Sequence, residues 1–518
     1  MKRRDFLHLA NTAVLSTALN GLPIRTLGQN PLLQLLARQT AENGKVMVFI
    51  QLIGGNDGLN TIIPIDQYSA LANARPNLVI AKNKLLPLNG TDTTGLHPAL
   101  GGLRNMYNDG LMNVVQSVSY PDQSFSHFRA TDIWLTGSDS LQYLNTGWLG
   151  RYLSEEHPGY PNGYPNSNFP HPLAIEIGNE TSIALMGTDV CMGMAISTID
   201  SFYNIINNEV ASAPNSKAGH ELTFLRYVAQ QSHEYTSALQ NAAAKAKNKA
   251  AYPDSDALAE QLKIVARLIA GGLNTPVYIV SLGGFDTHAS QVDSADTSAG
   301  KHSKLLGKLS AAVAAFFDDC RQLNIDDRVA AMTISEFGRR IKSNASVGTD
   351  HGTAGPVMVF GSGVNPGFIG SNPVIPEHAT VYDNLEMQHD FRSVYASVLS
   401  DWFEVERAIL DKVLPGNFEV LPIFRKNKQS AASTEMLSQN FPNPFTNNTT
   451  VPFVSQGGLV SIELYHSDGR MVRTITKQAY PAGPHTITIS RDGLQSGIYF
   501  MHMANLGARA VKKVIITD

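Results

Sequence analysis

Between about residues 45 and 424, short apolar runs alternate with stretches in which apolar residues recur at helical spacing. The apolar runs are continuous rather than alternating, which predicts strands buried on both faces. They span residues 46–53, 111–118, 277–282, 329–335 and 356–360. The stretches with helical spacing are 98–108, 256–270 and 304–323. This alternation predicts an α/β fold over residues 45–424, with a mostly parallel sheet sandwiched by helices.

The pattern changes near residue 425. Residues 425–436 are small and polar, which is typical of a linker. Beyond them, Val460–Tyr465 and Thr486–Ser490 alternate between apolar and polar residues, as half-buried strands do. Turn residues interrupt the runs at Asp468-Gly469, Pro481–Gly483 and Asp492-Gly493. Residues 437–518 are therefore expected to form a small antiparallel β-sandwich.

The N-terminus predicts an export signal over residues 1–30. A basic patch of Lys2, Arg3 and Arg4 precedes a weakly apolar run that extends from Phe6 to about Ile24. The Arg3-Arg4 pair is similar to a twin-arginine signal, although an ordinary secretory signal is the alternative. No other stretch of the sequence is long and apolar enough to predict a transmembrane span.

Composition narrows the possible functions. Of the 518 residues, 43% are hydrophobic and 16% charged, so the chain is too apolar for a disordered protein. Forty Lys and Arg residues against 44 Asp and Glu residues leave no basic surplus, so nucleic acid is not an expected partner. The two cysteines, Cys191 and Cys320, cannot form a cysteine-rich metal site. Any metal must therefore be bound by His, Asp and Glu.

Candidate chemistry follows the predicted strands. In open α/β sheets, ligands bind beyond the carboxyl ends of the strands. The polar residues next to successive strands are Asp57, then Ser126 and His127, then Asp286 and His288, then Glu336 with Arg339 and Arg340, and, before the last strand, Asp350 and His351. Each group alone also has a structural interpretation. Asp57 could cap the backbone of a tight loop, Asp286 and His288 could belong to a turn, and Glu336 could form a structural salt bridge with Arg339 or Arg340. Together they predict one shared site.

Carboxylates and imidazoles without thiolates suit one or two divalent cations with open coordination positions, and Zn²⁺ or Mn²⁺ fits best. Ser126 is the candidate nucleophile because it lies at the predicted start of a helix, where an anion is favoured. The alternative for Ser126 is a helix N-cap, and Ser124 competes for both roles. His127 is expected either to donate a hydrogen bond to the substrate or to face outward from the first turn of the helix, and His97 is a weaker candidate for the site lining.

Several motifs together resemble the domain-of-unknown-function 1501 family. They are Gly-Gly-Asn-Asp-Gly-Leu-Asn at 54–60, Ser-His-Phe at 126–128, Gly-Gly-Phe-Asp-Thr-His at 283–288, Ser-Glu-Phe-Gly-Arg at 335–339 and Thr-Asp-His-Gly at 349–352. This family is similar to the alkaline phosphatase and sulfatase superfamily, so the resemblance implies a metal-dependent hydrolase fold. It implies metal ligands at Asp57, Asp286, His288, Glu336 and His351, and a nucleophile at Ser126.

Two departures from the superfamily pattern are visible. Phe337 stands where a metal-binding histidine is usual, and Glu336 replaces an aspartate. One metal site is therefore expected to be altered or empty. The alternative alignment makes Asp350-His351-Gly352 the Asp-His-Gly motif, which adds Asp350 to the ligands.

The C-terminal segment resembles the type A sorting domain of the bacterial type IX secretion system. The matching pieces are residues 439–445, 465–470, 496–500 and 512–517. This resemblance implies a secretion-machinery partner, export through the periplasm, and a secreted or cell-surface protein. The alternative is a carbohydrate-binding or adhesive sandwich.

These observations favour a secreted metal-dependent hydrolase of phosphate or sulfate esters, acting on a small molecule or a polysaccharide. A second ion, or else Arg339 or Arg340, is expected to hold the non-bridging oxygens. The alternative is a non-catalytic surface binding protein on a degenerate hydrolase fold, which Phe337 favours. A conventional sulfatase is disfavoured, because neither Cys191 nor Cys320 lies near Ser126 in the sequence.

Overall fold

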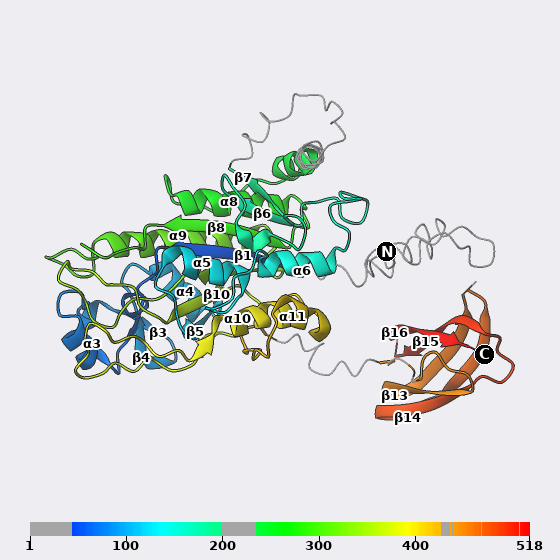
Figure 1. Ribbon diagram of the computed structural model, residues 1–518. Coiled ribbons are helices and arrows are strands. Elements are labelled where there is room, and N and C mark those ends of the chain that lie inside the picture. The colour runs from blue at the N-terminus through cyan, green and yellow to red at the C-terminus, as the bar shows by residue number, and fades with distance from the viewer. Residues whose placement is uncertain are drawn as a thin grey trace, which may run out of the picture. The chain divides into compact units, whose positions relative to one another are not determined.

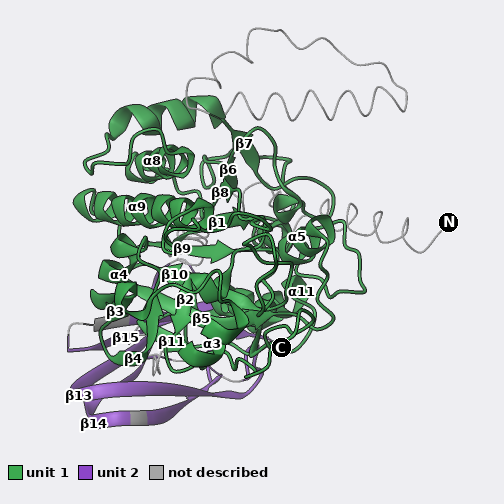
Figure 2. Ribbon diagram, turned by 90° about the vertical axis from the view of Figure 1, so that its left-hand side faces the viewer, with its two compact units in different colours: residues 1–425 green, residues 426–518 purple. Residues whose placement is uncertain are grey.

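The computed structural model describes residues 44–197, 235–425, 436–437, 440, 442–467, 469–506 and 508–517 (Figure 1). The predicted export signal at 1–30 and most of the predicted linker at 425–436 lie outside these residues. The chain divides into two compact units between Arg425 and Lys426 (Figure 2). Within the described residues, no helix combines the length and the apolar character needed to cross a bilayer.

The first unit is built on a sheet of nine described strands in the order β11-β5-β10-β9-β1-β8-β6-β7, with β12 also pairing with β5. The strand bounds are β1 Val46–Ile53, β5 Met112–Ser119, β6 Ala174–Ile177, β7 Met194–Ile196, β8 Val277–Gly283, β9 Val329–Ile334, β10 Gly355–Phe360, β11 Gly367–Ile369 and β12 His389–Asp390. The five strands expected from the sequence are all present, with ends that differ by one residue at most.

The predicted mostly parallel sheet is confirmed, and β10 is its exception. Strand β1 runs parallel to β8 and to β9, with Met47 opposite Val277 and Val46 opposite Val329. Strand β10 runs antiparallel to both of its neighbours, β5 and β9. As a result, the beginning of β10 lies at the edge where the parallel strands end.

Helices cover both faces of this sheet, as the continuous apolar strands require. Alternate residues of β1 enter different cores: Val48 and Ile50 belong to one, Met47 and Phe49 to the other. The first core is closed by α4 (Gly101–Asn108), α8 (Ala257–Ala270) and α9 (Lys301–Gln322). The second is closed by α5 (His127–Thr136), α6 (Trp148–Glu156), α10 (Phe391–Ser397) and α11 (Arg407–Val413), and Figure 2 shows α8 and α9 across the sheet from α5 and α11.

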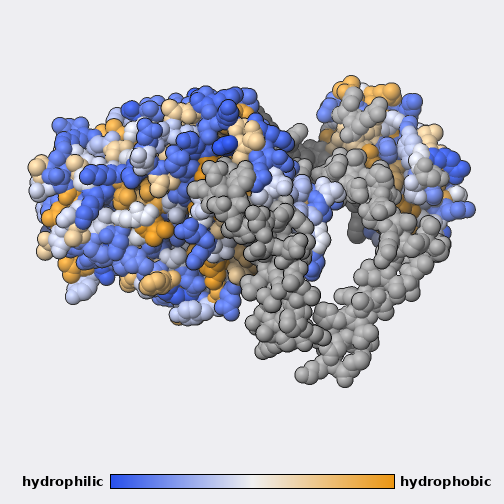
Figure 3. Space-filling model, turned by 90° about the horizontal axis from the view of Figure 1, so that it is seen from above, coloured by the Kyte–Doolittle hydropathy of each residue, from blue (hydrophilic) through white to orange (hydrophobic). Residues whose placement is uncertain are grey.

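Smaller elements complete the unit. A three-stranded sheet has the order β2-β4-β3, with β2 Ile62–Pro64, β3 Leu86–Leu88 and β4 Thr91–Leu96. Helix α3 (Tyr68–Ala74) follows β2, and short helical turns span Gly58–Asn60, Lys82–Lys84, Ile183–Leu185 and Val398–Trp402. The face seen in Figure 3 is mainly hydrophilic, with apolar side chains scattered among polar ones.

The second unit is all-β and antiparallel. Its described residues form one four-stranded sheet, β14-β13-β15-β16, where we expected two packed sheets. The bounds are β13 Asn448–His466, β14 Met471–Ser490, β15 Gly497–Asn505 and β16 Ala508–Ile516. The turn expected at Pro481–Gly483 lies within β14, because β14 is an edge strand, where a proline without an N–H group is tolerated.

Candidate metal centre

The carboxyl edge of the large sheet brings the candidate residues together. His127 is the first residue of α5, eight residues beyond the end of β5, and Asp286 follows β8 closely. His351 comes four residues before β10 and reaches the same edge because β10 is antiparallel. The position of His351 therefore depends on strand direction, which the sequence pattern alone does not reveal.

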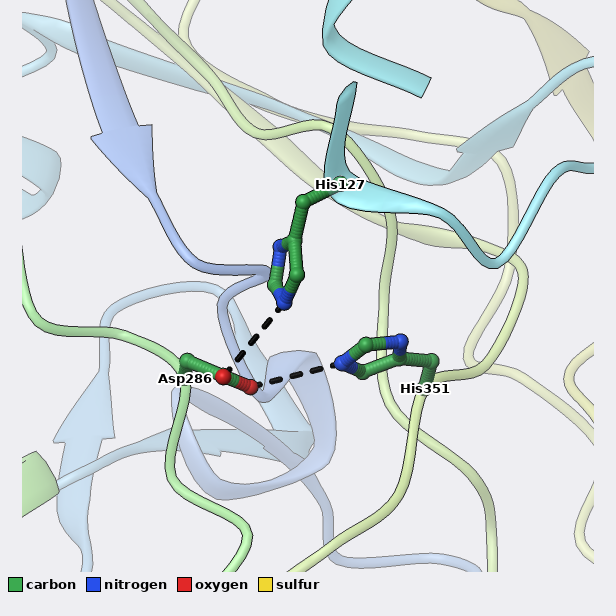
Figure 4. Close-up of side chains that lie close together, drawn as sticks. All are labelled: His127, Asp286 and His351. Carbon is green, nitrogen blue, oxygen red and sulfur yellow. Dashed lines mark hydrogen bonds and ion pairs between the residues drawn. The ribbon is translucent and has the colours of Figure 1, made fainter. Parts of the chain in front are cut away.

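Three side chains face one another at this edge (Figure 4). One potential ligand atom from each of His127, Asp286 and His351 lies within 4.8 Å of the other two. Nε2 of His127 is 3.4 Å from Oδ2 of Asp286, and Nε2 of His351 is 3.3 Å from Oδ1 of the same carboxylate. No other group of this kind is found among the residues that the structure describes.

His288 adds a third imidazole to the cluster. Its Nε2 atom is 3.1 Å from Oδ1 of Asp286 and 2.8 Å from Nε2 of His351. The second distance is that of a hydrogen bond between the two rings, so one Nε2 carries a proton that a bound cation would displace. His288 is thus a fourth possible ligand. Its Nε2 atom is closer to Nε2 of His351 than the ligand atoms of one metal ion normally are to each other.

Hydrogen bonds at the far side of each ring orient its Nε2 toward the cluster. Nδ1 of His351 lies 2.7 Å from the Phe125 carbonyl oxygen, which can only accept, so Nδ1 carries the proton and donates. Nδ1 of His127 lies 2.9 Å from Oε1 of Glu336 and donates to that carboxylate in the same way. A neutral ring with its proton on Nδ1 has a lone pair on Nε2, so both rings can offer Nε2 to a cation beside Asp286.

The same arrangement holds for His288, whose Nδ1 lies 3.1 Å from Oδ1 of Asp350. Asn344 donates to the same carboxylate oxygen over 3.0 Å and so fixes its position. Burial acts to raise the pKa of Asp350, but the hydrogen bonds from Asn344 and His288 outweigh it and lower the pKa. Asp350 is therefore ionised at neutral pH and can accept from His288.

The candidate ligands have the protonation states that a metal ion requires. Burial acts to raise the pKa of Asp286, but the hydrogen bond and charge of Arg339 outweigh it and lower the pKa to about 2. Burial is the main cause that lowers the pKa of His351; the Phe125 hydrogen bond acts to raise it, and the Arg339 charge acts to lower it. At neutral pH the carboxylate is charged and the His351 imidazole is neutral, as metal ligands must be.

The donor set fits a divalent cation such as Zn²⁺. Ligand atoms about 2.1 Å from a tetrahedral ion lie about 3.4 Å apart, close to the distances of His127 and His351 from Asp286. Metal-binding histidines typically donate their other N–H to a carboxylate or a backbone carbonyl, as His127 and His351 do. The residues present therefore fit one metal ion.

The position of Asp57 contradicts its predicted role as a metal ligand. The Asp57 side chain is fully buried and forms a salt bridge with Arg75, whose Nη1 lies 2.8 and 2.7 Å from the two carboxylate oxygens. Gln291 donates to Oδ2 over 2.6 Å. Burial acts to raise the pKa of Asp57, but the Arg75 charge and these hydrogen bonds lower it. Asp57 is thus half of a structural ion pair.

Glu336 and Asp350 also differ from their predicted roles. Both lie behind a histidine, on the Nδ1 side, and neither belongs to the group of converging ligand atoms. Glu336 is only 3% exposed, and its Oε1 also accepts from the Gly54 N–H over 2.8 Å. The reason is geometric, because His127 stands between Glu336 and Asp286. His127, expected to contact substrate, takes a ligand position instead.

Phe337 closes the side of the cluster where the superfamily pattern has a histidine. Its ring centroid is 4.4 Å from that of His351 and 5.0 Å from that of His127. Gly55 allows this packing, because a Cβ atom there would lie 2.3 Å from the Phe337 ring. The position expected to be altered is therefore filled by an aromatic ring.

Arg339 cannot hold substrate oxygens as predicted. Its side chain is fully buried, and its guanidinium donates to the carbonyls of Gly54, Gly55, Phe285 and Thr349 as well as to Asp286. These bonds connect the loops of Gly54 and Thr349 to the loop that carries Asp286. Arg340 is only partly buried, and its guanidinium lies 5.4 Å from the centre of the Phe125 ring. Among the described residues, Arg340 forms no ion pair within 4.0 Å.

Ser126 occupies the N-cap position of α5, with an exposed side chain that makes no capping hydrogen bond. Its N–H donates to Oγ of Ser124 over 3.3 Å. The cap alternative is thus not realised, and the Ser126 hydroxyl stays a candidate nucleophile next to His127. His97 lies elsewhere, fully buried, with its Nδ1 accepting from the Ala99 N–H over 3.0 Å.

Sequence reasoning missed the groups that hold the predicted residues in place. Arg75, at the C-terminal end of α3, forms the salt bridge with Asp57. Asn344 donates a hydrogen bond to Asp350, and the Phe125 carbonyl orients the ring of His351. A backbone carbonyl leaves no sequence signal. Arg75 and Asn344 stand in no motif, and only their tertiary position gives them a role.

The fold and the site define an α/β protein with a candidate metal centre and a second, all-β unit, and each unit matches a family model. Residues 97–411 match the family described as Protein of unknown function (DUF1501), and since this is more than half of the chain, the protein belongs to that family. Residues 439–517 match the secretion system C-terminal sorting domain, which marks the protein for export to the surface or the medium. No curated protein matches the chain.

Solved structures with some likeness include two from the alkaline phosphatase and sulfatase group. A protein in the alkaline phosphatase superfamily from Vibrio parahaemolyticus is 12% identical with a TM-score of 0.31, covering 83% of this chain and 81% of that one. A sulfatase from a Pseudoalteromonas species is 10% identical with a TM-score of 0.32, covering 89% and 88%. TM-scores this low carry no argument about function.

A third likeness concerns a short part of the chain. PorZ, a surface component of the type IX secretion system of Porphyromonas gingivalis, is 14% identical with a TM-score of 0.13. The match covers 18% of this chain and only 14% of PorZ.

Proposed function

We propose that the protein is an exported, metal-dependent hydrolase of phosphate or sulfate esters. One observation carries the proposal: three imidazoles direct their Nε2 atoms at Asp286, and the Nδ1 atom of each is held by an oxygen of Phe125, Glu336 or Asp350. Such second hydrogen bonds are typical of metal ligands and are not needed for three surface histidines.

His127, Asp286 and His351 would hold the ion, with His288 available as a fourth ligand. A divalent cation bound there, Zn²⁺ or Mn²⁺, supplies Lewis-acid polarisation of an ester oxygen and lowers the pKa of a nearby hydroxyl. The protein contributes a carboxylate that stays ionised down to about pH 2 and a His351 imidazole that stays neutral at pH 7. Protons therefore compete poorly with the cation at these two groups.

Ser126 would provide the nucleophile. It directly precedes His127 in the chain, and it lies at the N-terminus of the ten-residue helix α5, where unpaired N–H groups favour an anion. Its hydroxyl would attack phosphorus or sulfur, the ester oxygen would leave as an alcohol, and water would then release the acid from the serine. Arg340 would hold a non-bridging oxygen, because its guanidinium has no ion-pair partner among the described residues.

Elemental analysis and an ester panel test the proposal. The purified protein should contain about one Zn²⁺ or Mn²⁺ per chain and hydrolyse a member of a panel of phosphomonoesters, phosphodiesters and sulfate esters. Ser126→Ala should retain the metal but lose at least about 10³-fold in kcat. Ser124→Ala is the matched control and should stay within about tenfold of wild type. Full activity in Ser126→Ala would remove the serine from the mechanism.

A second candidate is a non-catalytic surface binding protein. Phe337 favours it, because its ring fills the position of a usual metal-binding histidine. The two candidates differ in metal content, since catalysis requires a tightly bound ion. Folded protein that stays metal-free in Zn²⁺-containing buffer would support the binding protein.

A further inference from the structure

Two large apolar side chains flank the candidate nucleophile and the candidate ligand His127. Phe125 is 40% exposed and Phe128, in the first turn of α5, is 91% exposed. Single exposed apolar residues are ordinary on protein surfaces, but several large ones beside a polar site are typical of a ligand-binding surface. Phe125 and Phe128 are therefore of interest because they flank Ser126 and His127 in the sequence.

Phe125 is held in place at both its backbone and its ring. Its carbonyl accepts the hydrogen bond from Nδ1 of His351 over 2.7 Å, and its ring lies 5.4 Å from the guanidinium of Arg340. A ligand on this ring would consequently contact a surface that is fixed relative to the metal centre and to a cation.

A loop after α5 adds two more exposed apolar side chains. Arg129 donates to the carbonyls of Asp139, Ser140 and Gln142, and its guanidinium lies 3.8 Å from the centre of the Tyr143 ring. These bonds bring the loop back toward the start of the helix. Its Leu141 and Tyr143 side chains are 85% and 77% exposed.

From these contacts we infer that the ester hydrolysed at this site carries a large apolar organic group, alkyl or aryl, which lies against Phe125 and Phe128. The inference rests on the proposed function and specifies its substrate class. The anionic head of such an ester complements Arg340 and a bound cation, and the organic group removes the phenylalanine rings from water. A small polar ester would leave both rings exposed.

Binding of phosphonates tests the inference without turnover. Methyl-, butyl- and octylphosphonate have the same head group and are not esters, so their affinities for the Zn²⁺-loaded protein are measured by calorimetry. Burying apolar carbon against protein strengthens binding by up to about fourfold per methylene, and about twofold is expected on an open surface. Octylphosphonate should therefore bind roughly 100-fold more tightly than methylphosphonate.

The readout is the ratio of octyl to methyl affinity. Phe128→Ala should lower this ratio at least about fivefold, and Phe128→Leu should restore part of it. Leu459→Ala, which removes a 58% exposed apolar side chain from the second unit, is the matched control and should leave the ratio unchanged. Both side chains are exposed, so neither change should prevent folding.

Failure of this inference and failure of the proposed function give different results. If all three phosphonates bind with equal affinity, the apolar surface is overturned and the metal-dependent anion site stands. If only octylphosphonate binds, and Phe128→Ala weakens it, the apolar surface stands without the anion site. If none binds, both are overturned.

The apolar group can belong to a dispersed ester or to a lipid. Sedimentation with phosphatidylglycerol vesicles separates these sources. Sedimentation of wild type but not of Phe128→Ala supports a lipid-borne ester. Wild type that stays in solution, with octylphosphonate bound, supports a dispersed ester.

Discussion

Nδ1 of His127 lies 2.9 Å from Oε1 of Glu336, a carboxylate that is 3% exposed and belongs to a different strand end. This contact assigns the two residues different roles: the imidazole faces Asp286, and the glutamate orients the imidazole. It also explains why Glu336, predicted as a metal ligand, does not reach the cluster: the His127 ring lies between Glu336 and Asp286.

The first prediction concerns that contact. Glu336→Gln keeps the size and the acceptor oxygen but removes the charge behind His127, so Zn²⁺ affinity should fall about 10- to 100-fold. Competition with a chelator measures it. Glu377→Gln changes an exposed glutamate of the same unit and should have no effect. Equal affinity in Glu336→Gln and wild type would contradict the orienting role.

The second prediction separates Asp57 from the metal centre. Asp57→Asn leaves the buried Arg75 charge unpaired and should lower the free energy of unfolding by about 3–5 kcal/mol. Urea unfolding in the presence of a chelator measures this loss. Asp92→Asn, at an exposed position, should change stability by less than about 0.5 kcal/mol.

The same experiment has a second arm. Replacing both partners, as in Asp57→Asn with Arg75→Met, removes the unpaired charge and should recover part of the lost stability. Folded Asp57→Asn should still bind one metal ion. Loss of the metal without loss of stability would return Asp57 to the ligand set.

The third prediction concerns the close approach of Gly55 to Phe337. Gly55 has φ +77°, and a Cβ there would lie 2.3 Å from the ring, so Gly55→Ala should destabilise the protein by about 2–4 kcal/mol. Gly90 has a similar φ of +83° but no atom near its missing Cβ. Gly90→Ala therefore measures the backbone cost alone, expected at about 1 kcal/mol. Thermal unfolding that shows equal losses would exclude the ring contact as the cause.

The fourth prediction concerns pH. Burial is the largest cause that lowers the pKa of His302 to about 4, so the folded protein keeps this imidazole neutral. Between about pH 6.5 and 4 the unfolded chain binds a proton there that the folded chain does not bind, so stability must fall as the pH falls through this range. The loss from this residue is on the order of 3 kcal/mol and is complete below pH 4.

His302→Gln tests the pH prediction. Glutamine can still donate to Oδ1 of Asn56, which lies 3.0 Å from Nε2 of His302. Unfolding free energies at pH 7 and pH 4.5, both with chelator, should differ less in the variant than in wild type. An equal pH dependence in both proteins would assign the effect to other groups.

The sequence was a good guide to the fold because its signal is local. A strand buried on both faces needs a continuous apolar run, and 46–53 shows that run within eight residues. The same locality explains where it failed. Pro481 and Gly483 have strong turn character, but pairing with β13 keeps them within strand β14.

For the candidate site, the sequence predicted which residues gather at one edge of the sheet but not which of them contact one another. Asp286, His288 and His351 could be chosen from their positions beside strands, because parallel strand ends meet at one edge. Their exact partners could not, because the Phe125 carbonyl that orients His351 and the Arg339 guanidinium that binds Asp286 come from other segments of the chain.

The sequence by itself determined the α/β architecture, the strand ends that carry polar residues, and the C-terminal sorting domain. Only the tertiary structure decided which carboxylate faces the cluster, which supports a histidine and which neutralises a buried arginine. The physical reason is that Asp57, Glu336 and Asp286 each accept a hydrogen bond from a residue more than fifty positions away, namely Gln291, Gly54 and Arg339, and that the His127 ring stands between Glu336 and Asp286. No local sequence pattern encodes either relationship.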